Sequence, residues 1–108
     1  MEIGLENEQV KAIQHVLSSF PEVEEAILFG SRAKGNFKPG SDIDLALKGR
    51  TLPLESLLLL YNSLEELELP YTFDLVNYDT IKEPDLTNHI NRIGKVFYTK
   101  AKAEQRAV

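Results

Sequence analysis

The chain has 108 residues and a formal net charge of -5 at pH 7, and 43% of its residues are hydrophobic. A chain of this length is expected to form one domain, and its acidic balance argues against a protein that binds nucleic acid directly. It has no cysteine and no apolar run near the roughly 18 residues that span a bilayer, which argues against disulfides, thiolate metal sites and a membrane helix. Because its first residues are polar and acidic, unlike a secretory signal, we expect a cytoplasmic protein.

The first half of the chain predicts two helices with a strand between them. Residues 7–20 carry apolar side chains at helical spacing, with Asn7 as the expected N-cap and Pro21 directly after the helix. Residues 24–29 contain a nearly continuous apolar run, which predicts a short strand buried on both faces. A short helix is expected from Ser31, because glycine and proline interrupt the segment that follows.

The second half predicts two strands and two helices. Apolar residues alternate over residues 42–47 and again over residues 71–77, and this alternation is typical of strands. Pro53 is expected in the first turn of a long helix that runs to about Leu67, and a last helix is expected over residues 85–92. The predicted buried face of the long helix consists of Leu54, Leu57, Leu58, Tyr61, Leu64 and Leu67.

These elements predict an α/β (α+β) fold, in which a small mixed sheet packs against helices. Three strands are expected, and residues 96–98 add either a further short strand or a clasp at the end of the domain. The domain is expected to cover residues 1–99. A disordered tail is expected over residues 100–108, which are charged and only weakly apolar.

Asp42 and Asp44 are the first candidates for chemistry. Their spacing places both carboxylates on one strand face, within reach of one divalent cation. Mg²⁺ usually binds through one or two carboxylates and substrate phosphates, so the pair predicts a site for a metal-bound polyphosphate. For an isolated pair the alternative is an exposed strand face, or capping of the preceding loop by Asp42.

The segment before this pair favours a phosphate ligand. Gly30 and Ser31 follow the buried strand directly, where glycine permits a tight turn and the serine hydroxyl can donate to phosphate oxygens. Between Arg32 and Lys38 there are three basic residues and no acidic one, and we expect Lys34 to contact phosphate. The alternative is an ordinary strand-to-helix turn. The pattern is not a P-loop, since no Gly-Lys-Ser/Thr follows at the required spacing.

Asp74 is the third candidate acid. It lies between two apolar residues of a predicted strand, where aspartate is disfavoured without a partner or a task. If that strand lies beside the one that carries Asp42 and Asp44, three carboxylates converge, and two metal ions about 3.5–4 Å apart could serve an in-line displacement. The alternative is an edge aspartate that faces water. By contrast, His15 and His89 show no partner pattern and are expected to be surface residues of their helices.

Three segments of the chain together resemble a known family. They are similar to the motifs of the nucleotidyltransferase superfamily of DNA polymerase beta, and more narrowly to those of the MNT-type minimal nucleotidyltransferases of bacteria and archaea. The likeness covers about residues 10 to 99. The motifs that carry it are Gly30-Ser31-x-Ala33-Lys34-Gly35, Ser41-Asp42-Ile43-Asp44-Leu45 and Phe73-Asp74-Leu75-Val76.

The resemblance implies a nucleotidyltransferase fold in which an acceptor oxygen attacks the α-phosphorus of ATP and pyrophosphate leaves. Two Mg²⁺ ions are implied, and the residues implied as their ligands and as catalytic acids are Asp42, Asp44 and Asp74. The residues implied as nucleotide contacts are Gly30, Ser31, Lys34 and Ser41. The family often has Arg where this chain has Lys34, and lysine keeps the charge but loses the bidentate fork.

Small members of this family resemble the antitoxin of a two-gene module whose other product is a helical HEPN-domain protein. The resemblance implies transfer of AMP from ATP to a tyrosine of that partner, which blocks the partner's ribonuclease action. The chain is too short for a separate acceptor domain, so a partner or a second subunit is expected to complete the pocket. Two alternatives stay open: a catalytically silent subunit that neutralises its partner by binding, and a transferase for a small hydroxylated molecule of the aminoglycoside type.

Overall fold

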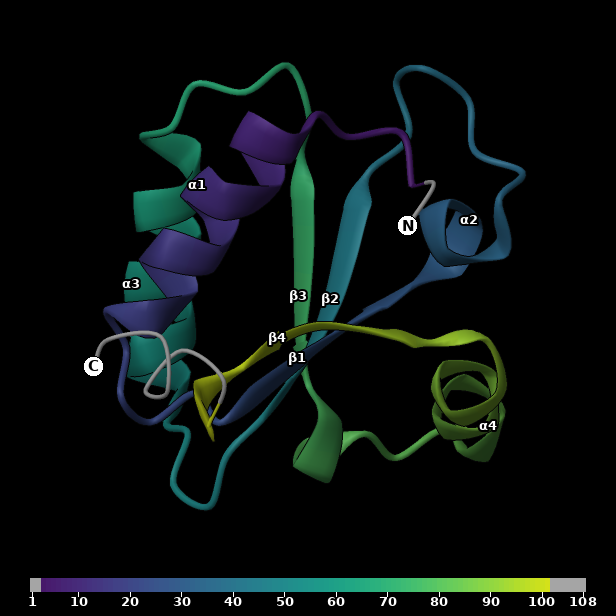
Figure 1. Cartoon of the computed structure of the whole chain (residues 1–108). Coiled ribbons are helices and arrows are strands. Elements are labelled where there is room, and N and C mark those ends of the chain that lie inside the picture. Colours follow the sequence, from purple (N-terminus) through teal and green to yellow (C-terminus); the bar gives the residue numbers. More distant parts are fainter. Residues whose placement is uncertain (1–2, 102–108) are drawn as a thin grey trace.

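The computed structural model of the chain describes residues 3–101. The elements in this part, in chain order, are α1 (Asn7–Ser18), β1 (Glu25–Phe29), α2 (Gly30–Lys34), β2 (Ile43–Lys48), α3 (Leu54–Glu65), β3 (Phe73–Asn77), the 3-10 helix η1 (Tyr78–Thr80), α4 (Pro84–Ile93) and β4 (Lys95–Thr99). The strands form one mixed sheet in the order β3-β2-β1-β4 (Figure 1). The predicted small mixed sheet is thus confirmed, and residues 96–98 belong to a strand at its edge rather than to a clasp.

The strand directions follow from the connections between them. β1 is antiparallel to both β2 and β4, whereas β2 and β3 are parallel because α3 carries the chain back to the start of the neighbouring strand. Phe29 at the end of β1 pairs with Asp44, and Ile43 at the start of β2 pairs with Phe73. The end of β1 and the beginnings of β2 and β3 therefore meet at one edge of the sheet.

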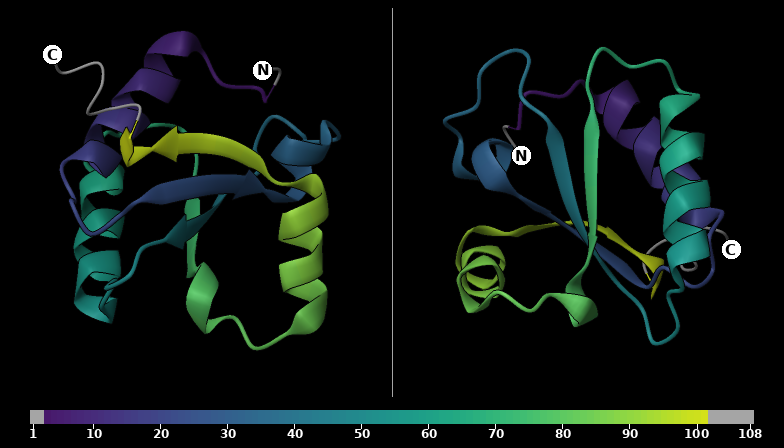
Figure 2. Two further views of the ribbon diagram at one scale, coloured as in Figure 1. Left: turned by 60° about the horizontal axis from the view of Figure 1, so that its bottom comes forward. Right: turned by 180° about the vertical axis from the view of Figure 1, so that it is seen from behind.

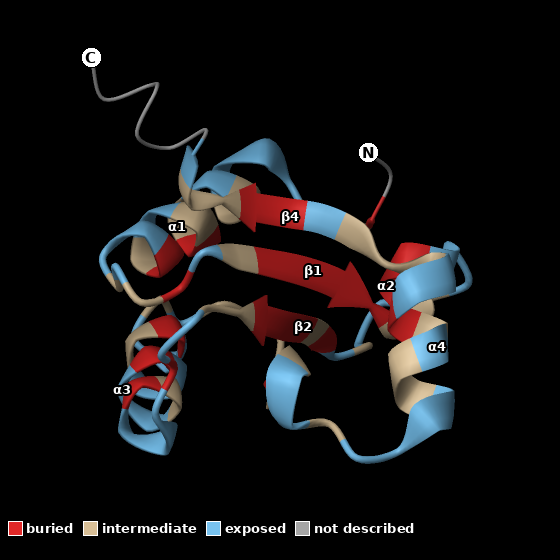
Figure 3. Cartoon of the chain, turned by 90° about the horizontal axis from the view of Figure 1, so that it is seen from below, coloured by how far each residue is buried: buried red, intermediate tan, exposed pale blue. Residues whose placement is uncertain are grey.

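Helices cover both faces of the sheet. α1 and α3 lie side by side on one face and α4 covers the other, while α2 lies next to α4 at the end of β1 (Figure 1, Figure 2). No helix in the described residues is both long and apolar enough to cross a membrane. The inner strands β1 and β2 are buried along most of their length, as predicted for residues 24–29 (Figure 3).

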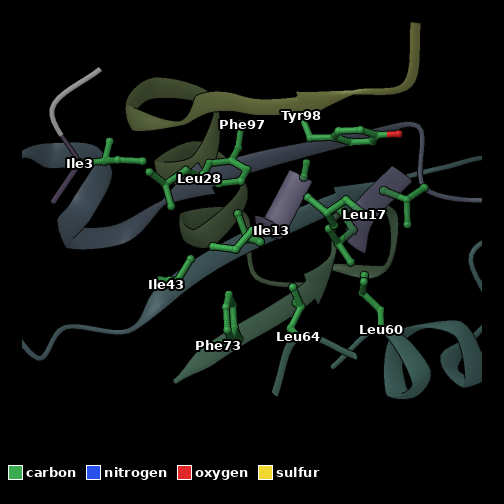
Figure 4. Close-up of a cluster of buried hydrophobic side chains, with 14 of the residues drawn as sticks. Ile3, Ile13, Leu17, Leu28, Ile43, Leu60, Leu64, Phe73, Phe97 and Tyr98 are labelled. Carbon is green, nitrogen blue, oxygen red and sulfur yellow. The ribbon is translucent and has the colours of Figure 1, made fainter. Parts of the chain in front are cut away.

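Two apolar clusters fill the space between these layers. The smaller one lies between the sheet and α4 and consists of Ile27, Phe29, Ala46 and Ile90. The larger one lies on the α1 and α3 side, and Figure 4 shows among its members Ile13, Leu17, Leu28, Ile43, Leu60, Leu64 and Phe73. The alternation of β2 therefore separates two environments, because its odd-numbered residues enter the larger core while Asp44 and Ala46 face the other side.

The buried face of α3 differs from the predicted one. The residues that α3 buries are Ser56, Leu60 and Leu64, with Leu57 and then Leu67 beyond its end partly buried beside them. The predicted core residues Leu54, Leu58 and Tyr61 are instead 68%, 58% and 36% exposed. Leucine occupies positions all around this helix, so hydrophobic spacing does not select a face. Its packing against β3 and α1 makes the selection.

The ends of the domain also differ in detail from the sequence prediction. The N-cap of α1 is Glu6, whose amide donates to Gln9 Oε1 at 3.0 Å, rather than Asn7. Of the predicted tail, Lys100 is attached to the sheet, because its amide donates to the Glu24 carbonyl at 2.9 Å. Residues 102–108 of that tail lie outside the described residues.

Candidate functional site

Asp44 and Asp74 are paired across the two parallel strands. They are in register in the β2–β3 ladder, so both side chains extend from the same face of the sheet. Asp42 directly precedes β2 and is two residues from Asp44, which places it toward that face as well. Asp44 is half-buried, whereas Asp42 and Asp74 are exposed. The structure therefore brings the three predicted acids to one edge of the sheet.

The carboxylates at this edge of the sheet affect the pKa of Asp44. Burial, followed by the charges of Asp74 and Asp42, raises the pKa of Asp44 to about 6, and the Arg32 guanidinium opposes part of the rise. The ionised form of Asp44 is thus disfavoured in the protein as it stands. A bound cation would favour that form, because an opposite charge stabilises a carboxylate.

The three acids do not by themselves form a complete metal site. Within residues 3–101, no group of three or more His, Cys, Asp or Glu side chains is placed to hold a metal ion. Mg²⁺ needs no such group, because it is usually bound by one or two carboxylates together with water and substrate phosphates. The exposed Asp42 and the half-buried Asp44 fit that mode of binding.

Gly30 begins α2 directly behind the Asp44 carboxylate. Its φ of 73° lies in the left-handed region, and a Cβ at this position would clash with Asp44 Oδ2. The preceding residue, Phe29, is paired with Asp44 in the β1–β2 ladder. The predicted turn therefore needs glycine for two reasons: the conformation of the backbone and the close approach of a candidate metal ligand.

His89 of α4 also contacts this turn. The Gly30 amide donates a hydrogen bond to His89 Nε2 at 3.1 Å, and the imidazole stands edge-on to Phe29 with 6.1 Å between ring centroids. His89 is half-buried, so the prediction of a surface residue is wrong for it, whereas His15 is exposed as expected. Gly30 and His89 are 59 residues apart, and no local pattern in the sequence links them.

Arg32 is a second contributor that the sequence does not reveal. Its side chain is 1% exposed, and its guanidinium donates to the carbonyls of Ile3 at 3.0 Å and Ser41 at 2.8 Å. It also lies over the Tyr71 ring, 4.7 Å from the centroid. Arg32 therefore ties α2 to the N-terminal segment and to the residue before Asp42, and these contacts turn it away from solvent.

The other predicted nucleotide contacts have different environments. Ser31 is half-buried on the first turn of α2, and Lys34 is exposed on its last turn. The Ser41 hydroxyl accepts a hydrogen bond from the Lys38 amide at 2.8 Å, and its carbonyl accepts from Arg32. Ser41 thus shapes the loop that leads into β2.

Thr72 fixes the position of Asp42. Its hydroxyl donates to Asp42 Oδ1, and its carbonyl accepts from the Ile43 amide at 2.9 Å. The segment before β3 is thereby joined to the segment before β2. Sequence reasoning does not find Thr72, because its contact with Asp42 depends on the pairing of strands 30 residues apart.

The chain matches the family model "Polymerase beta, Nucleotidyltransferase" over residues 11–103. Solved structures share its fold. A toxin–antitoxin complex with AMP-PNP gives a TM-score of 0.70 at 23% identity, over 89% of this chain and 77% of that chain. The complex of a tri-AMPylated Shewanella oneidensis HEPN toxin with an MNT antitoxin gives a TM-score of 0.67 at 20% identity. That match covers 94% of this chain and 78% of that chain.

The toxin–antitoxin MntA–HepT gives a TM-score of 0.65 at 20% identity, over 93% of this chain and 78% of that chain. No curated protein matches the chain. The family model covers most of the sequence and includes all three acids and the Gly30 turn. The chain therefore belongs to the polymerase beta nucleotidyltransferase family.

Proposed function

We propose that this chain is a Mg²⁺-dependent nucleotidyltransferase that moves AMP from ATP to a hydroxyl of a partner protein. The observation that carries the proposal is the register of Asp44 with Asp74 beside the Gly30 turn. This arrangement supports a site in which the acids hold a metal and receive the proton of an acceptor hydroxyl, beside a turn that faces the triphosphate. Membership of the family supports the class of reaction.

In the proposed mechanism, Asp42 and Asp44 would hold a divalent metal ion, and Gly30 and Ser31 contact the β- and γ-phosphates. Mg²⁺ supplies charge neutralisation for the phosphate oxygens. Asp74 would also hold metal, and its carboxylate accepts the proton of the acceptor hydroxyl as the hydroxyl oxygen attacks the α-phosphorus. The bond from the α-phosphorus to the bridging oxygen breaks, and pyrophosphate leaves. A second Mg²⁺ is proposed because Asp74 pairs with Asp44.

Lys34 and Ser41 have supporting roles in this proposal. The exposure of Lys34 leaves its ammonium free to move toward a bound triphosphate, where it acts as a point charge. Ser41 contributes through the loop that it closes with Lys38 and Arg32, so its effect on nucleotide binding passes through the position of Asp42.

We further propose that the acceptor is a tyrosine of a HEPN-domain protein and that the chain acts as an antitoxin. Asp42 and Asp74 are both exposed, so the acceptor side of the site is open to a macromolecule. Structures with the same fold include complexes with HEPN toxins, one of them tri-AMPylated. These observations support a partner that brings its own hydroxyl to the site.

The test is transfer of label from [α-³²P]ATP to a purified HEPN-domain protein, with Mg²⁺ present. The wild-type chain is expected to label the partner, and the Asp42→Asn and Asp44→Asn variants are expected to lose at least about a hundredfold in rate. Asp79→Asn is the matched control, because Asp79 is an exposed aspartate on η1, outside the site. Labelling by the Asp44→Asn variant at the wild-type rate would refute the proposal.

A second candidate function is neutralisation of the partner by binding alone. The exposed apolar side chains of α3 favour it, because Leu54, Leu58 and Leu59 are each more than half exposed and such groups often mark contact surfaces. Under this alternative a variant with all three acids replaced would neutralise the partner as well as the wild type, and the partner's mass would not change. The transferase proposal requires instead a mass increase of one AMP per modified hydroxyl.

A further inference from the structure

We infer that His89 is a positioning residue of the proposed reaction, which holds the Gly30 turn at a fixed place against Asp44. The inference rests on the proposed function, because the turn and the carboxylate are the parts of the site that His89 keeps together. Its direct support is the hydrogen bond from the Gly30 amide to His89 Nε2 at 3.1 Å. Nothing in the proposed mechanism so far uses this side chain.

Gly30 is confined from two directions. On one side the Asp44 carboxylate leaves no space for a β-carbon, and on the other side the amide of Gly30 is bound to His89. If the hydrogen bond is lost, the peptide can rotate away from α4, and the left-handed conformation of Gly30 has one restraint fewer. Because the turn and Asp44 lie in contact, such a rotation changes the space between the proposed phosphate and metal sites.

His89 is itself held in place. Its ring stands edge-on to Phe29 with an interplanar angle of 81°. The next residue, Ile90, is 2% exposed and belongs to the smaller core cluster, and Asn91 accepts a hydrogen bond from the Tyr78 hydroxyl at 2.7 Å. α4 is therefore anchored at the two residues that follow His89, so the acceptor nitrogen is presented from a fixed element rather than from a loop.

The hydrogen bond defines the chemical state of the ring. Nε2 can accept from a backbone amide only through its lone pair, so the neutral imidazole carries its proton on Nδ1. Glutamine can present a carbonyl oxygen from a side chain of similar reach, whereas phenylalanine keeps an aromatic ring beside Phe29 but has no acceptor. These two substitutions therefore separate the hydrogen bond from simple packing.

The first experiment observes the hydrogen bond directly. In ¹⁵N-labelled protein, a scalar coupling is expected between the Gly30 amide nitrogen and His89 Nε2, both in the free protein and with Mg²⁺ and a non-hydrolysable ATP analogue. Presence of the coupling in both states supports the inference. Its absence from the free protein, or its loss when the analogue binds, would overturn it.

The second experiment measures the consequence for nucleotide binding. His89→Phe is expected to raise the Kd for Mg²⁺–ATP by calorimetry, and the KM for ATP, by roughly three- to tenfold, the range of one lost hydrogen bond, with kcat changed less than about twofold. His89→Gln is expected to stay within about twofold of the wild type in each quantity. His15→Gln is the matched control, since His15 is exposed on α1.

A lower melting temperature in His89→Phe with unchanged Kd and KM would mean that His89 only packs the helix, and the inference would fail. The failure of the proposed function is distinguishable from this result. If the wild type binds Mg²⁺–ATP but transfers nothing, the transferase proposal fails, while the coupling and the Kd values still decide the role of His89.

Discussion

Gly30 lies so close behind Asp44 that a β-carbon at position 30 would clash with the Oδ2 atom of that carboxylate. The same residue has a φ of 73°, which a side chain would strain. Two other glycines allow these effects to be separated. Gly35 has a φ of 88° with open space around it, and Gly40 has open space without a left-handed φ.

Replacement of these glycines by alanine tests the two effects. Backbone strain alone costs about 1–2 kcal/mol, and Gly30→Ala is expected to lower the free energy of unfolding by more than this. It is also expected to lower AMP transfer at least about tenfold, because the new β-carbon displaces Asp44. Gly35→Ala is expected to lower the free energy of unfolding by the backbone strain alone. Gly40→Ala is expected to change neither stability nor activity. Urea unfolding and the transfer assay measure these outcomes. Full transfer by the Gly30→Ala variant would contradict the geometry.

Asp44 gives a pH dependence of stability with a definite sign. Its folded pKa of about 6 lies above its ordinary value, so between about pH 4 and pH 6 the folded protein binds more protons than the unfolded chain. Its contribution to stability is therefore present below about pH 4 and is lost as the pH rises through 6. The Asp44→Asn variant lacks this carboxyl and does not show the loss. In metal-free buffer, its free energy of unfolding relative to that of the wild type is expected to rise by about 1 kcal/mol between pH 4 and pH 7.5, because solvent screens part of the effect.

Denaturant unfolding at several pH values measures this difference. Asp79→Asn controls for the removal of one negative charge at an exposed position. A constant difference between the Asp44→Asn variant and the wild type across this range would show that burial and the neighbouring carboxylates do not raise the pKa of Asp44.

Arg32 is expected to be important for stability, although it belongs to a segment rich in basic residues. Arg32→Lys keeps the charge, but an ammonium group cannot donate to the carbonyls of both Ile3 and Ser41 as the guanidinium does. The free energy of unfolding is therefore expected to fall by about 2–3 kcal/mol. Lys38→Met, at an exposed position of the loop that follows α2, is the control and is expected to change stability by less than about 0.5 kcal/mol. If urea unfolding gives the same value for both variants, the buried contacts of Arg32 contribute nothing.

Thr72→Val separates metal binding from folding. Valine is close to threonine in shape but cannot donate to Asp42, so Mg²⁺–ATP affinity is expected to fall roughly tenfold. Stability is expected to change by less than about 1 kcal/mol, because Thr72 is exposed. Calorimetric titration measures the affinity, and Thr51→Val, at an exposed loop position, is the control. Unchanged affinity in the Thr72→Val variant would show that Asp42 needs no support from the segment before β3.

Much of the candidate site could be predicted because its parts are local. The alternation that sets Asp42 and Asp44 apart from Ile43 depends on residues two positions apart, and the Gly30 turn follows its strand directly. The strands and helices were predicted in the right order for the same reason. Where local spacing is uninformative the prediction fails, as in α3, where leucines on all sides leave the choice of face to β3 and α1.

The sequence by itself determined the acids, the turn and the family resemblance, because side-chain direction along a strand and the freedom of glycine act over a few residues. The tertiary structure decided that β3 lies beside β2 in parallel, which pairs Asp74 with Asp44. It also decided that His89 meets Gly30 and that Arg32 is buried. These contacts join residues far apart in the chain, and they depend on how whole layers pack rather than on any local pattern.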